Sequence, residues 1–480
     1  MNVTSSPTTE LRRGALGVGF IIFFVVSAAS PFSVLAGGFP IGIMLGNGAG
    51  TPSLILMVLA ILLLFSVGYT TMARHVTDAG GFYAFSTRGL GPIPGGAVGG
   101  LALFAYNILQ IGLYGMFGGV AAGTLKALFG LSLPWWLCAL LAMASISAFG
   151  YRKIDLSAKV LCLIVMAEYG VILVLDIAIL SSGGAHGVDF ASFQAESVLS
   201  GSPSIGLLFC FAAFIGFEAT TIYGEEAKNP RRDIPLATYA SILLIGFFYT
   251  FSTWSMIVGV GSDRVVETLV QLKDPTVLIY GLADHYVGSA LTQIARVLFL
   301  VSIYAGLLAF HNSAARYFYA IGRDGLLPGA LGRTHPRHRS PYVGSLVQTL
   351  IAAAAVLIFA ACGSDPILEL FAWFSSLAAL SLILLMALTS LAVACYFQRH
   401  PELGVGVWRG RLLPLLASAL LLGVMVIAVA HFDVLTGSSK MLSYALCLLI
   451  VLSLAIGGLM AMRLRRAEPE RFSQLGLHRI

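Results

Sequence analysis

Twelve apolar stretches, each long enough to cross a lipid bilayer, constrain the fold of this chain more than any other feature. They begin near Leu16, Ser53, Gly95, Pro134, Ala158, Ser204, Leu236, Ala290, Tyr342, Pro366, Leu412 and Met441. About 20 apolar residues in a helix span the hydrocarbon core of a membrane. With 58% hydrophobic and 10% charged residues and a mean hydropathy of +0.91, the chain does not belong to the soluble globular class. We therefore predict an all-α integral membrane protein with twelve transmembrane helices.

Basic residues distribute unequally between the two sides of this twelve-helix topology. One side holds only Lys126, Arg264, Lys273, Arg296 and Lys440. The other side holds Arg12, Arg13, Arg74, Arg88, Arg152, Lys153, Lys228, Arg231, Arg232, Arg323, Arg333, Arg337, Arg339, Arg399, Arg409, Arg411, Arg463, Arg465 and Arg466. Loops rich in Lys and Arg stay in the cytoplasm. We expect a multi-pass protein of the cytoplasmic (cell) membrane with both termini cytoplasmic. This topology explains the pI near 9.0, so no nucleic-acid partner is inferred.

The loops and cysteines are typical of a single integral membrane domain covering residues 1–480. The longer outer loops run over Ser181–Pro203 and Gly261–Val287, and Val265–Leu272 is predicted to form a short surface helix. The six cysteines lie in or beside apolar helices without a CxxC or Cys/His pairing, so we interpret them as small core residues and predict no metal site. We expect no cofactor, and the sequence carries no signal for an oligomeric state.

Two of the apolar segments contain residues that interrupt helices. In the first, Pro31 removes a backbone donor and Gly37-Gly38 lower the helix propensity. In the sixth, Gly216–Thr221 has the same character. If the first ten helices form two five-helix halves, these interruptions occupy matched positions, which is the best sequence indication of a transporter binding site. The alternative for Pro31 is a simple kink in a core helix.

The ends of interrupted helices favour a zwitterionic ligand. Free N–H groups at one half-helix attract a carboxylate, and unpaired carbonyls at the other attract an ammonium group. A sugar would need more buried polar side chains than these helices offer. An amino acid is therefore the preferred substrate class.

Two carboxylates lie deep inside apolar segments and need partners there. Glu218 lies within 205–223, and Glu168 lies well inside the fifth helix. Acidic side chains at such depth cost about 2.5–3.5 kcal/mol on insertion scales and are retained where they face a cavity, a partner or an ion path. Burial favours the neutral form of a carboxyl group, which suits proton coupling; the alternative is a glutamate that only joins helices. Asp176 is expected at a solvated helix end, and His311 is either a proton shuttle or a packing residue.

Aromatic and polar side chains accompany the interruptions. One or two of the aromatic residues are expected to close over the substrate, with Phe214 and Phe217 favoured. The aromatic residues at the predicted depth are Phe32, Tyr106, Tyr114, Phe211, Phe214, Phe217, Tyr304 and Trp373. Asn107, Gln110 and Tyr114 recur at helical spacing and should face the interior. The sequence contains no Walker loop, HExxH motif or matched nucleophile and base, so we predict no enzyme.

The segment Phe214-Ile-Gly-Phe-Glu218-Ala, followed by Glu225-Glu226-Ala-Lys-Asn229-Pro230-Arg231-Arg-Asp-Ile-Pro235, resembles the amino acid/polyamine/organocation transporter superfamily. Gly80-Gly81-Phe-Tyr83 and Arg323-Asp324-Gly325-Leu-Leu-Pro328 agree with it. The resemblance implies a leucine-transporter-type fold: inverted five-helix repeats over 14–181 and 201–397, with broken helices 1 and 6, then helices 11 and 12 over 411–465 and a cytoplasmic tail over 466–480. Some proton-coupled members carry a lysine in the fifth helix where this chain has Glu168, which leaves the coupling ion and the preferred substrate charge open.

The resemblance also implies the substrate contacts. They come from the first and sixth helices, with Glu218 helping to couple occupancy to gate closure. We expect the site to include Ser30, Pro31, Phe32, Ser33, Ala36, Gly37, Gly38, Phe214, Ile215, Gly216, Phe217, Glu218 and Thr220, together with Tyr114 and Tyr304.

The expected function is secondary active import of an amino acid or related small amine by alternating access, coupled to protons through Glu168 and Glu218. One alternative is a uniporter or exchanger of polyamines or other cationic amines, with these glutamates as counter-charges. Another is a ligand sensor that does not transport. Sodium coupling also stays open, with Ser302 and Ser313 as weak candidate ligands.

Overall fold

A computed structural model describes residues 17–76, 80–152, 158–221, 227–336, 340–437 and 439–475, and these residues form helices without a β-strand. Eight residues considered above lie outside the described ranges: Arg12, Arg13, Leu16, Lys153, Glu225, Glu226, Arg337 and Arg339. The α-helices are α1 Val18–Ala28, α2 Pro31–Ser33, α3 Phe39–Leu45, α4 Thr51–Ala73, α5 Gly81–Leu90, α6 Pro92–Phe129, α7 Trp135–Arg152, α8 Ala158–Ser181, α9 Ala195–Leu199, α10 Pro203–Ala213, α11 Pro230–Val260, α12 Val265–Leu272, α13 Leu278–Tyr286, α14 Ser289–Arg323, α15 Tyr342–Ala361, α16 Ala372–Arg399, α17 Leu413–Ala430, α18 Lys440–Ala467 and α19 Pro469–Ser473. Shorter 3₁₀ or π turns are η1 Val34–Gly38, η2 Gly48–Gly50, η3 Ala191–Phe193, η4 Phe217–Thr221, η5 Pro275–Val277, η6 Pro366–Phe371, η7 Pro401–Leu403, η8 Trp408–Leu412 and η9 Phe432–Val434.

Eleven helical segments of the described chain are long and apolar enough to cross a membrane. They match eleven of the twelve predicted stretches. The stretch predicted near Pro134 folds as α7, whose apolar part, Trp135–Tyr151, is shorter than the other eleven. The all-helical membrane class is thus confirmed, whereas the count of twelve spanning helices is not.

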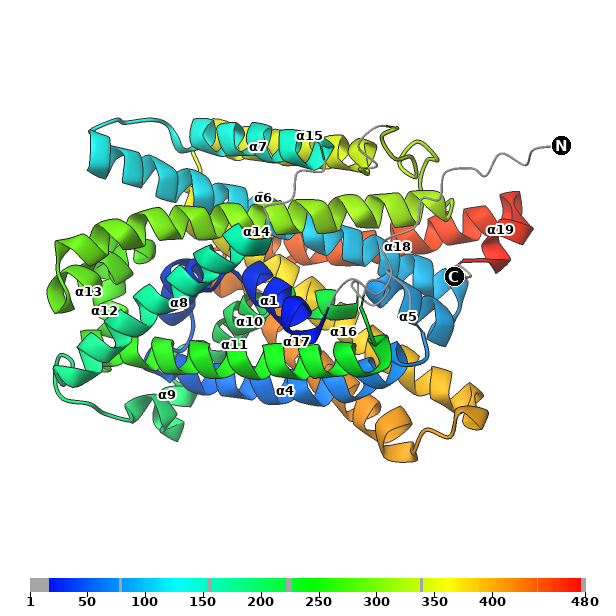
Figure 1. The fold of residues 1–480 in the computed structure, drawn as a ribbon, viewed down its shortest axis with the longest axis horizontal. Helices are drawn as coiled ribbons and strands as arrows, with labels where there is room; N and C mark the ends of the chain where they lie inside the picture. Colours follow the sequence, from blue (N-terminus) through cyan, green and yellow to red (C-terminus); the bar gives the residue numbers. More distant parts are fainter. Residues whose placement is uncertain are drawn as a thin grey trace.

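The long helix α6 forms the centre of the bundle. It packs against α18, α16, α14, α5 and α7, while α4 packs against α11 and α16 against α17. Figure 1 shows α7 and α15 side by side along one edge of the molecule, and these two helices are in contact. Short elements gather at the two ends of the bundle: α9, α12 and α13 at one, α5 and α19 at the other (Figure 1).

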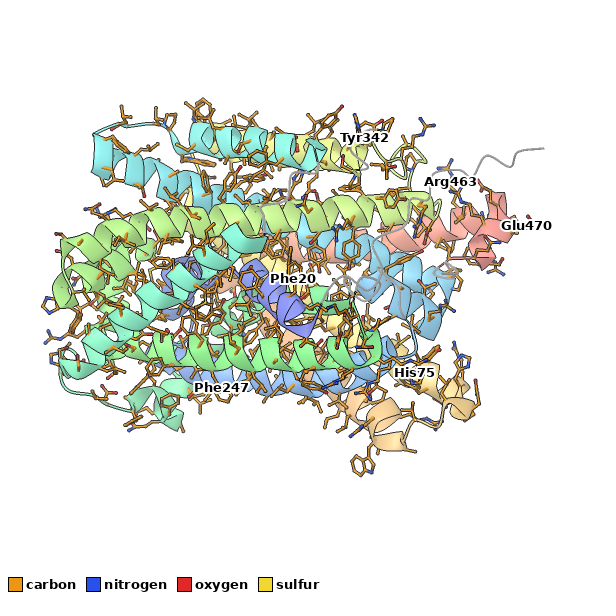
Figure 2. All side chains as sticks on the ribbon, viewed as in Figure 1. Phe20, His75, Phe247, Tyr342, Arg463 and Glu470 are labelled. Carbon is orange, nitrogen blue, oxygen red and sulfur yellow. The ribbon has the colours of Figure 1, made fainter. Side chains whose placement is uncertain are left out.

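Apolar side chains cover the perimeter of the bundle. Phe247 on α11 projects away from the helices in Figure 2 and is 59% exposed. Large exposed apolar residues also line α15, α17 and α18, for example Leu350, Val426 and Met441. Exposure of such a surface to water would be unfavourable, whereas contact with lipid tails is not, because the tails are as apolar as these side chains. The exterior therefore fits a membrane environment.

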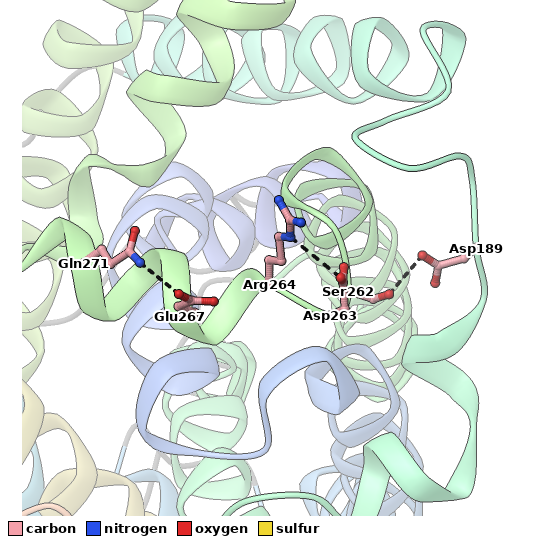
Figure 3. Close-up of polar contacts among 6 residues, drawn as sticks. All are labelled: Asp189, Ser262, Asp263, Arg264, Glu267 and Gln271. Carbon is pink, nitrogen blue, oxygen red and sulfur yellow. Dashed lines mark hydrogen bonds and ion pairs between the residues drawn. The ribbon is translucent and has the colours of Figure 1, made fainter.

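Asp189 holds the first long outer loop against the bundle. Its carboxylate accepts hydrogen bonds from the backbone N–H of Ala191 at 2.8 Å and from Ser262 Oγ at 3.0 Å (Figure 3). Its carbonyl accepts a bond from Trp254 Nε1 at 2.9 Å. The loop is thereby fixed to the C-terminal end of α11.

The predicted short helix over Val265–Leu272 forms as α12 and packs against α3. Val265 and Leu269 are its buried residues. Its outer face carries Glu267, which accepts a bond from Gln271 Nε2 at 3.0 Å (Figure 3). This helix therefore lies over the second half of the interrupted first helix.

Candidate functional site

The first helix is interrupted at Ala29 and Ser30, between α1 and α2. Pro31 has no N–H to donate, and its ring disfavours helical angles at the preceding residue. Ser30 accordingly adopts left-handed angles, with φ 46° and ψ 68°. Such angles at a residue other than glycine cost of the order of 1–3 kcal/mol, and they cluster at functional sites. Tyr249 Oη of α11 donates to the freed carbonyl of Ala29 at 3.2 Å.

This interruption is narrower than the sequence predicted. Gly37 and Gly38 were expected to extend it, but both lie in the π-helical turn Val34–Gly38, which leads directly into α3. A π turn keeps backbone hydrogen bonds while widening the helix. Pro31 therefore breaks the helix, and the two glycines only widen it.

The freed N–H groups at the start of α2 are bound by side chains from two other helices. Phe32 N–H donates to Glu168 Oε2 of α8 at 3.2 Å, and Ser33 N–H donates to Ser302 Oγ of α14 at 3.1 Å. Ser302 Oγ in turn donates to Glu168 Oε2 at 3.0 Å. Because the N-terminus of a helix carries partial positive charge, a carboxylate is favoured there. Glu168 thus joins three helices at the first interruption.

The sixth helix is interrupted between Ala213, where α10 ends, and Phe217, where the 3₁₀ turn η4 begins. Gly216 lies between them with φ 115°, a conformation that only glycine adopts readily. Phe217–Thr221 then continues as a 3₁₀ turn rather than an α-helix. The sequence Gly-Phe-Glu thus places a sharp change of direction immediately before the carboxylate.

Glu218 is hydrogen-bonded on both carboxylate oxygens. Tyr106 Oη of α6 donates to Oε1 at 2.6 Å, and Gly216 N–H donates to Oε2 at 2.9 Å. The Glu218 carbonyl accepts from Tyr69 Oη and Thr221 Oγ1, each at 3.1 Å. These bonds satisfy the buried carboxyl group of Glu218, and no basic side chain among the described residues pairs with it.

A cavity of about 60 Å³, measured as room for the centres of water-sized spheres, lies beside both interruptions. Its walls come from the first helix, α6, α10, α14 and α16. The lining residues are Ala29, Ser30, Ser33, Val34, Gly38, Leu109, Leu113, Met116, Phe209, Ala212, Ala213, Ile215, Ile303, Gly306, Phe310, Phe371 and Ser375. Serine is the only polar type among these described residues, and none of them carries a charged side chain.

The structure brings four of the predicted site residues to the lining of this cavity. Ser30, Ser33, Gly38 and Ile215 line it. The remaining predicted residues are not among the described lining: Pro31, Phe32, Ala36, Gly37, Tyr114, Glu168, Phe214, Gly216, Phe217, Glu218, Thr220 and Tyr304.

The three predicted phenylalanine contacts outside the lining pack against other aromatic side chains. Phe32 meets Phe299, with ring centroids 6.0 Å apart. Phe217 forms an edge contact with Phe65, and Phe214 forms one with Tyr249. These three rings therefore belong to the packed interior beside the interruptions and not to the described lining.

Tyr304 bonds to a neighbouring helix, whereas Tyr114 bonds within its own helix. Tyr304 Oη lies 2.8 Å from Ser145 Oγ of α7. Tyr114 Oη accepts from Gln110 Nε2 at 3.2 Å.

Two further titratable residues lie in the bundle interior. His311 is fully buried, with Nδ1 3.2 Å from Gln110 Nε2 and Nε2 2.6 Å from Ser345 Oγ. Asp176 was expected to be solvated at a helix end, and this was wrong, because it is 1% exposed and accepts from Ser252 Oγ of α11 at 2.6 Å. Packing of α8 against α11 covers it.

Sequence reasoning missed most of the cavity lining, above all the apolar residues of α6. Leu109, Leu113 and Met116 recur every three or four residues and therefore share one helix face. That spacing could have placed them together, but an apolar stripe looks the same whether it faces a ligand or another helix.

Among the described residues, no group of three His, Cys, Asp or Glu side chains could hold a metal ion. All six cysteines lie in the described ranges and are free thiols. Cys138 and Cys210 are buried, but Cys162 and Cys362 are exposed, so the expectation of six core cysteines was only partly right.

The apolar spanning helices, two of them interrupted beside an internal cavity, define a multi-pass membrane protein. Residues 21–470 match the family model for amino acid permeases, so the chain belongs to the amino acid permease family. The members of this family are transporters, and the chain is a transporter rather than an enzyme. The resemblance to the amino acid/polyamine/organocation superfamily is confirmed.

Relatives with named functions differ in what they carry. The low-affinity putrescine importer PlaP of Escherichia coli (strain K12) is 25% identical over 375 residues, covering 74% of this chain and 77% of that protein. The branched-chain amino acid permease BcaP of Bacillus subtilis (strain 168) is 26% identical over 333 residues, covering 64% and 68%. A mutant manganese transporter of Eremococcus coleocola superposes with a TM-score of 0.59 at 15% identity, covering 96% of this chain and 99% of that one. This last likeness concerns the fold alone.

Proposed function

We propose that this chain is a secondary active transporter that imports an amino acid or related small amine across the cytoplasmic membrane by alternating access. The observation that carries the proposal is the cavity beside two interrupted membrane helices. Irregular backbone at membrane depth is tolerated only where it is buried in protein or lines a cavity, and transporters place substrate sites there. The amine and amino acid named for the two relatives support the same substrate range.

The proposal includes a repeat architecture. The interruptions fall in the first and sixth apolar segments, which are corresponding positions of five-helix repeats over 14–181 and 201–397. Helices 11 and 12 over 411–465 and the tail 466–480 follow them. Under this arrangement the two halves move against each other around the cavity. Both termini are proposed to be cytoplasmic, and the cytoplasmic side would be the end of the bundle where Figure 1 shows α5 and α19.

Proton coupling is proposed through Glu168, with Glu218 contributing at the sixth helix. Glu168 Oε2 holds the backbone of the first helix, and its partners are one N–H and one hydroxyl group. Protonation would remove the negative charge that faces the start of α2 and weaken its attraction to the helix dipole. The first helix would then separate more readily from α8. A membrane potential supplies about 2.3 kcal/mol per charge per 100 mV, which is enough to drive accumulation without ATP.

The test is uptake of radiolabelled amino acids and amines into proteoliposomes, with and without an inward proton gradient. The parent protein should respond to the gradient, whereas Glu168→Gln should keep exchange and lose that response. Asp176→Asn is the matched control, because Asp176 is a second buried carboxyl group on the same helix. Absence of flux for the whole panel would refute transport, and equal effects of the two substitutions would refute the role of Glu168.

A cationic amine is the second candidate substrate, favoured by the relative that imports putrescine. In that case Glu168 and Glu218 would act as counter-charges. Both carboxylates are already hydrogen-bonded to protein groups, and neither is among the described residues that line the cavity. Loss of binding of cationic substrates alone in Glu168→Gln would select this alternative.

A further inference from the structure

The walls of the cavity differ in polarity. The first helix contributes Ser30 and Ser33. Ser33 is 3% exposed, and its Oγ has no hydrogen-bond partner among the described residues. A buried hydroxyl without a hydrogen-bond partner is unfavourable unless a ligand or a water molecule supplies that partner. This wall therefore suits the polar head of a ligand.

The wall contributed by α6 is apolar throughout. Leu109, Leu113 and Met116 face the cavity from this helix, and Phe371 adds an apolar side chain from the turn η6. A charged group pressed against such a surface would lose its hydration without gaining a partner. An apolar side chain of a ligand would instead exchange water for close-packed carbon atoms.

We propose that the substrate is a neutral amino acid with an apolar side chain, which packs against α6, and that Met116 sets the size of side chain accepted. This inference rests on the proposed transport function and narrows its substrate class. It assigns the serines of the first helix to the polar head group and the α6 wall to the side chain. A second positive charge on the substrate has no counter-charge among the described lining residues.

Met116 is held in place by its contact with the first helix. A Cβ atom added at Gly37 would lie 2.5 Å from Met116 Sδ and 3.3 Å from Phe299 Cζ. Methionine is flexible and fills irregular gaps, so it would move aside before the backbone does. Because Met116 also lines the cavity, Gly37→Ala should displace its side chain and reduce the space for the ligand. Gly37 and Met116 together would therefore determine how much space the cavity offers to the side chain of the ligand.

The test is competition against radiolabelled leucine uptake in proteoliposomes by valine, leucine, methionine, phenylalanine, lysine and putrescine. Apolar amino acids should compete, whereas lysine and putrescine should not. Met116→Ala should improve competition by phenylalanine relative to valine by about tenfold, since one or two carbon atoms in an apolar pocket are worth about 10- to 200-fold. Gly37→Ala should shift the same ratio in the opposite direction.

The control is Met143→Ala, which truncates a buried methionine of α7 outside the lining and should leave the ratio unchanged. Met116→Leu, which keeps the volume, shows whether the site still folds, and each variant must elute as a single species from size exclusion. Stronger competition by putrescine or lysine than by leucine would overturn the inference while leaving transport intact. An unchanged ratio in folded Met116→Ala would overturn the role of Met116. If leucine is not carried, labelled lysine and putrescine are tried next: their uptake overturns this inference alone, and absence of all flux overturns the proposed function.

Discussion

The two helix interruptions satisfy their freed backbone groups in different ways. At the first, the partners come from three other helices: Glu168 of α8, Tyr249 of α11 and Ser302 of α14. At the sixth, Glu218 belongs to the interrupted segment itself and binds its own Gly216 N–H. A movement of the first helix relative to its neighbours must therefore break the bonds that hold its freed backbone groups, whereas the sixth would lose the bonds from Tyr106 and Tyr69 but keep the one from Gly216 N–H to Glu218. We call the first interruption the joint, because side chains of other helices bind its freed backbone groups. We call the sixth the closed turn, because Glu218 within the turn binds Gly216 N–H.

The largest effect is expected from removing the cap of the sixth helix. Glu218→Ala leaves Tyr106 Oη and Gly216 N–H without an acceptor. Hydrogen bonds to a charged group contribute roughly 1.5–3 kcal/mol each, so a loss of about 3–5 kcal/mol is expected. Thermal unfolding of detergent-purified protein measures it. Glu218→Gln keeps one acceptor and the side-chain shape, so it should lose less stability than Glu218→Ala. Equal losses in the two variants would show that the charge of the carboxylate, and not its shape, stabilises the turn.

Gly216→Ala should have the second-largest effect. Its φ of 115° strains any residue with a Cβ atom, at a cost of about 1–3 kcal/mol. The matched control is Gly170→Ala in α8, where an added Cβ meets nothing within 4 Å and where alanine favours the helix by up to about 1 kcal/mol. The two substitutions should shift the unfolding temperature in opposite directions. A stable Gly216→Ala variant would mean that the sixth interruption adapts and is not a closed turn.

Much of this arrangement follows from local sequence. Hydropathy identifies the membrane segments, Pro31 breaks the first helix through its missing N–H, and two lone carboxylates mark buried polar contacts. The partners of those carboxylates could not be predicted from local sequence, because Tyr106 and Glu218 are 112 residues apart and Phe32 and Glu168 are 136 apart. Such pairs depend on helix packing, which a single sequence does not specify.

The position of Asp176 illustrates the same limit. Counting along the fifth helix placed it near the outer boundary, where water was expected. Packing of α8 against α11 covers it instead and supplies Ser252 as a donor. The apolar cavity wall was unpredictable for a related reason, since Leu113 and Met116 have no chemistry that separates a binding face from a packing face.

Ser302→Ala is expected to act at the first interruption with a smaller effect than Glu218→Ala. It removes the acceptor of Ser33 N–H and one donor to Glu168, but Phe32 N–H still binds the carboxylate. The expected loss is about 1–3 kcal/mol, that of leaving one buried donor unsatisfied. The unfolding temperature measures it, with Ser313→Ala as control, because Ser313 Oγ bonds only the Ala309 carbonyl of its own helix. If Ser302→Ala loses as much stability as Glu218→Ala, the joint and the closed turn do not differ in how they are held.

The smallest effect, and one of opposite sign, is expected at Ser30. Glycine accepts left-handed angles without the Cβ penalty, although it gains more freedom when unfolded, so Ser30→Gly should stabilise the protein by at most about 1 kcal/mol. The hydrogen bond from Ser30 Oγ to the Ser27 carbonyl is long, at 3.4 Å, and its loss should matter little. Ser30→Ala keeps the Cβ atom and should not stabilise. If Ser30→Gly lowers the unfolding temperature as Gly216→Ala does, the first interruption is held by the Ser30 hydroxyl and not by the proline that follows it. If Ser30→Gly instead raises the unfolding temperature, backbone strain is stored at Ser30 in the joint. It is then not stored at the closed turn, where Gly216 already adopts its positive φ without strain.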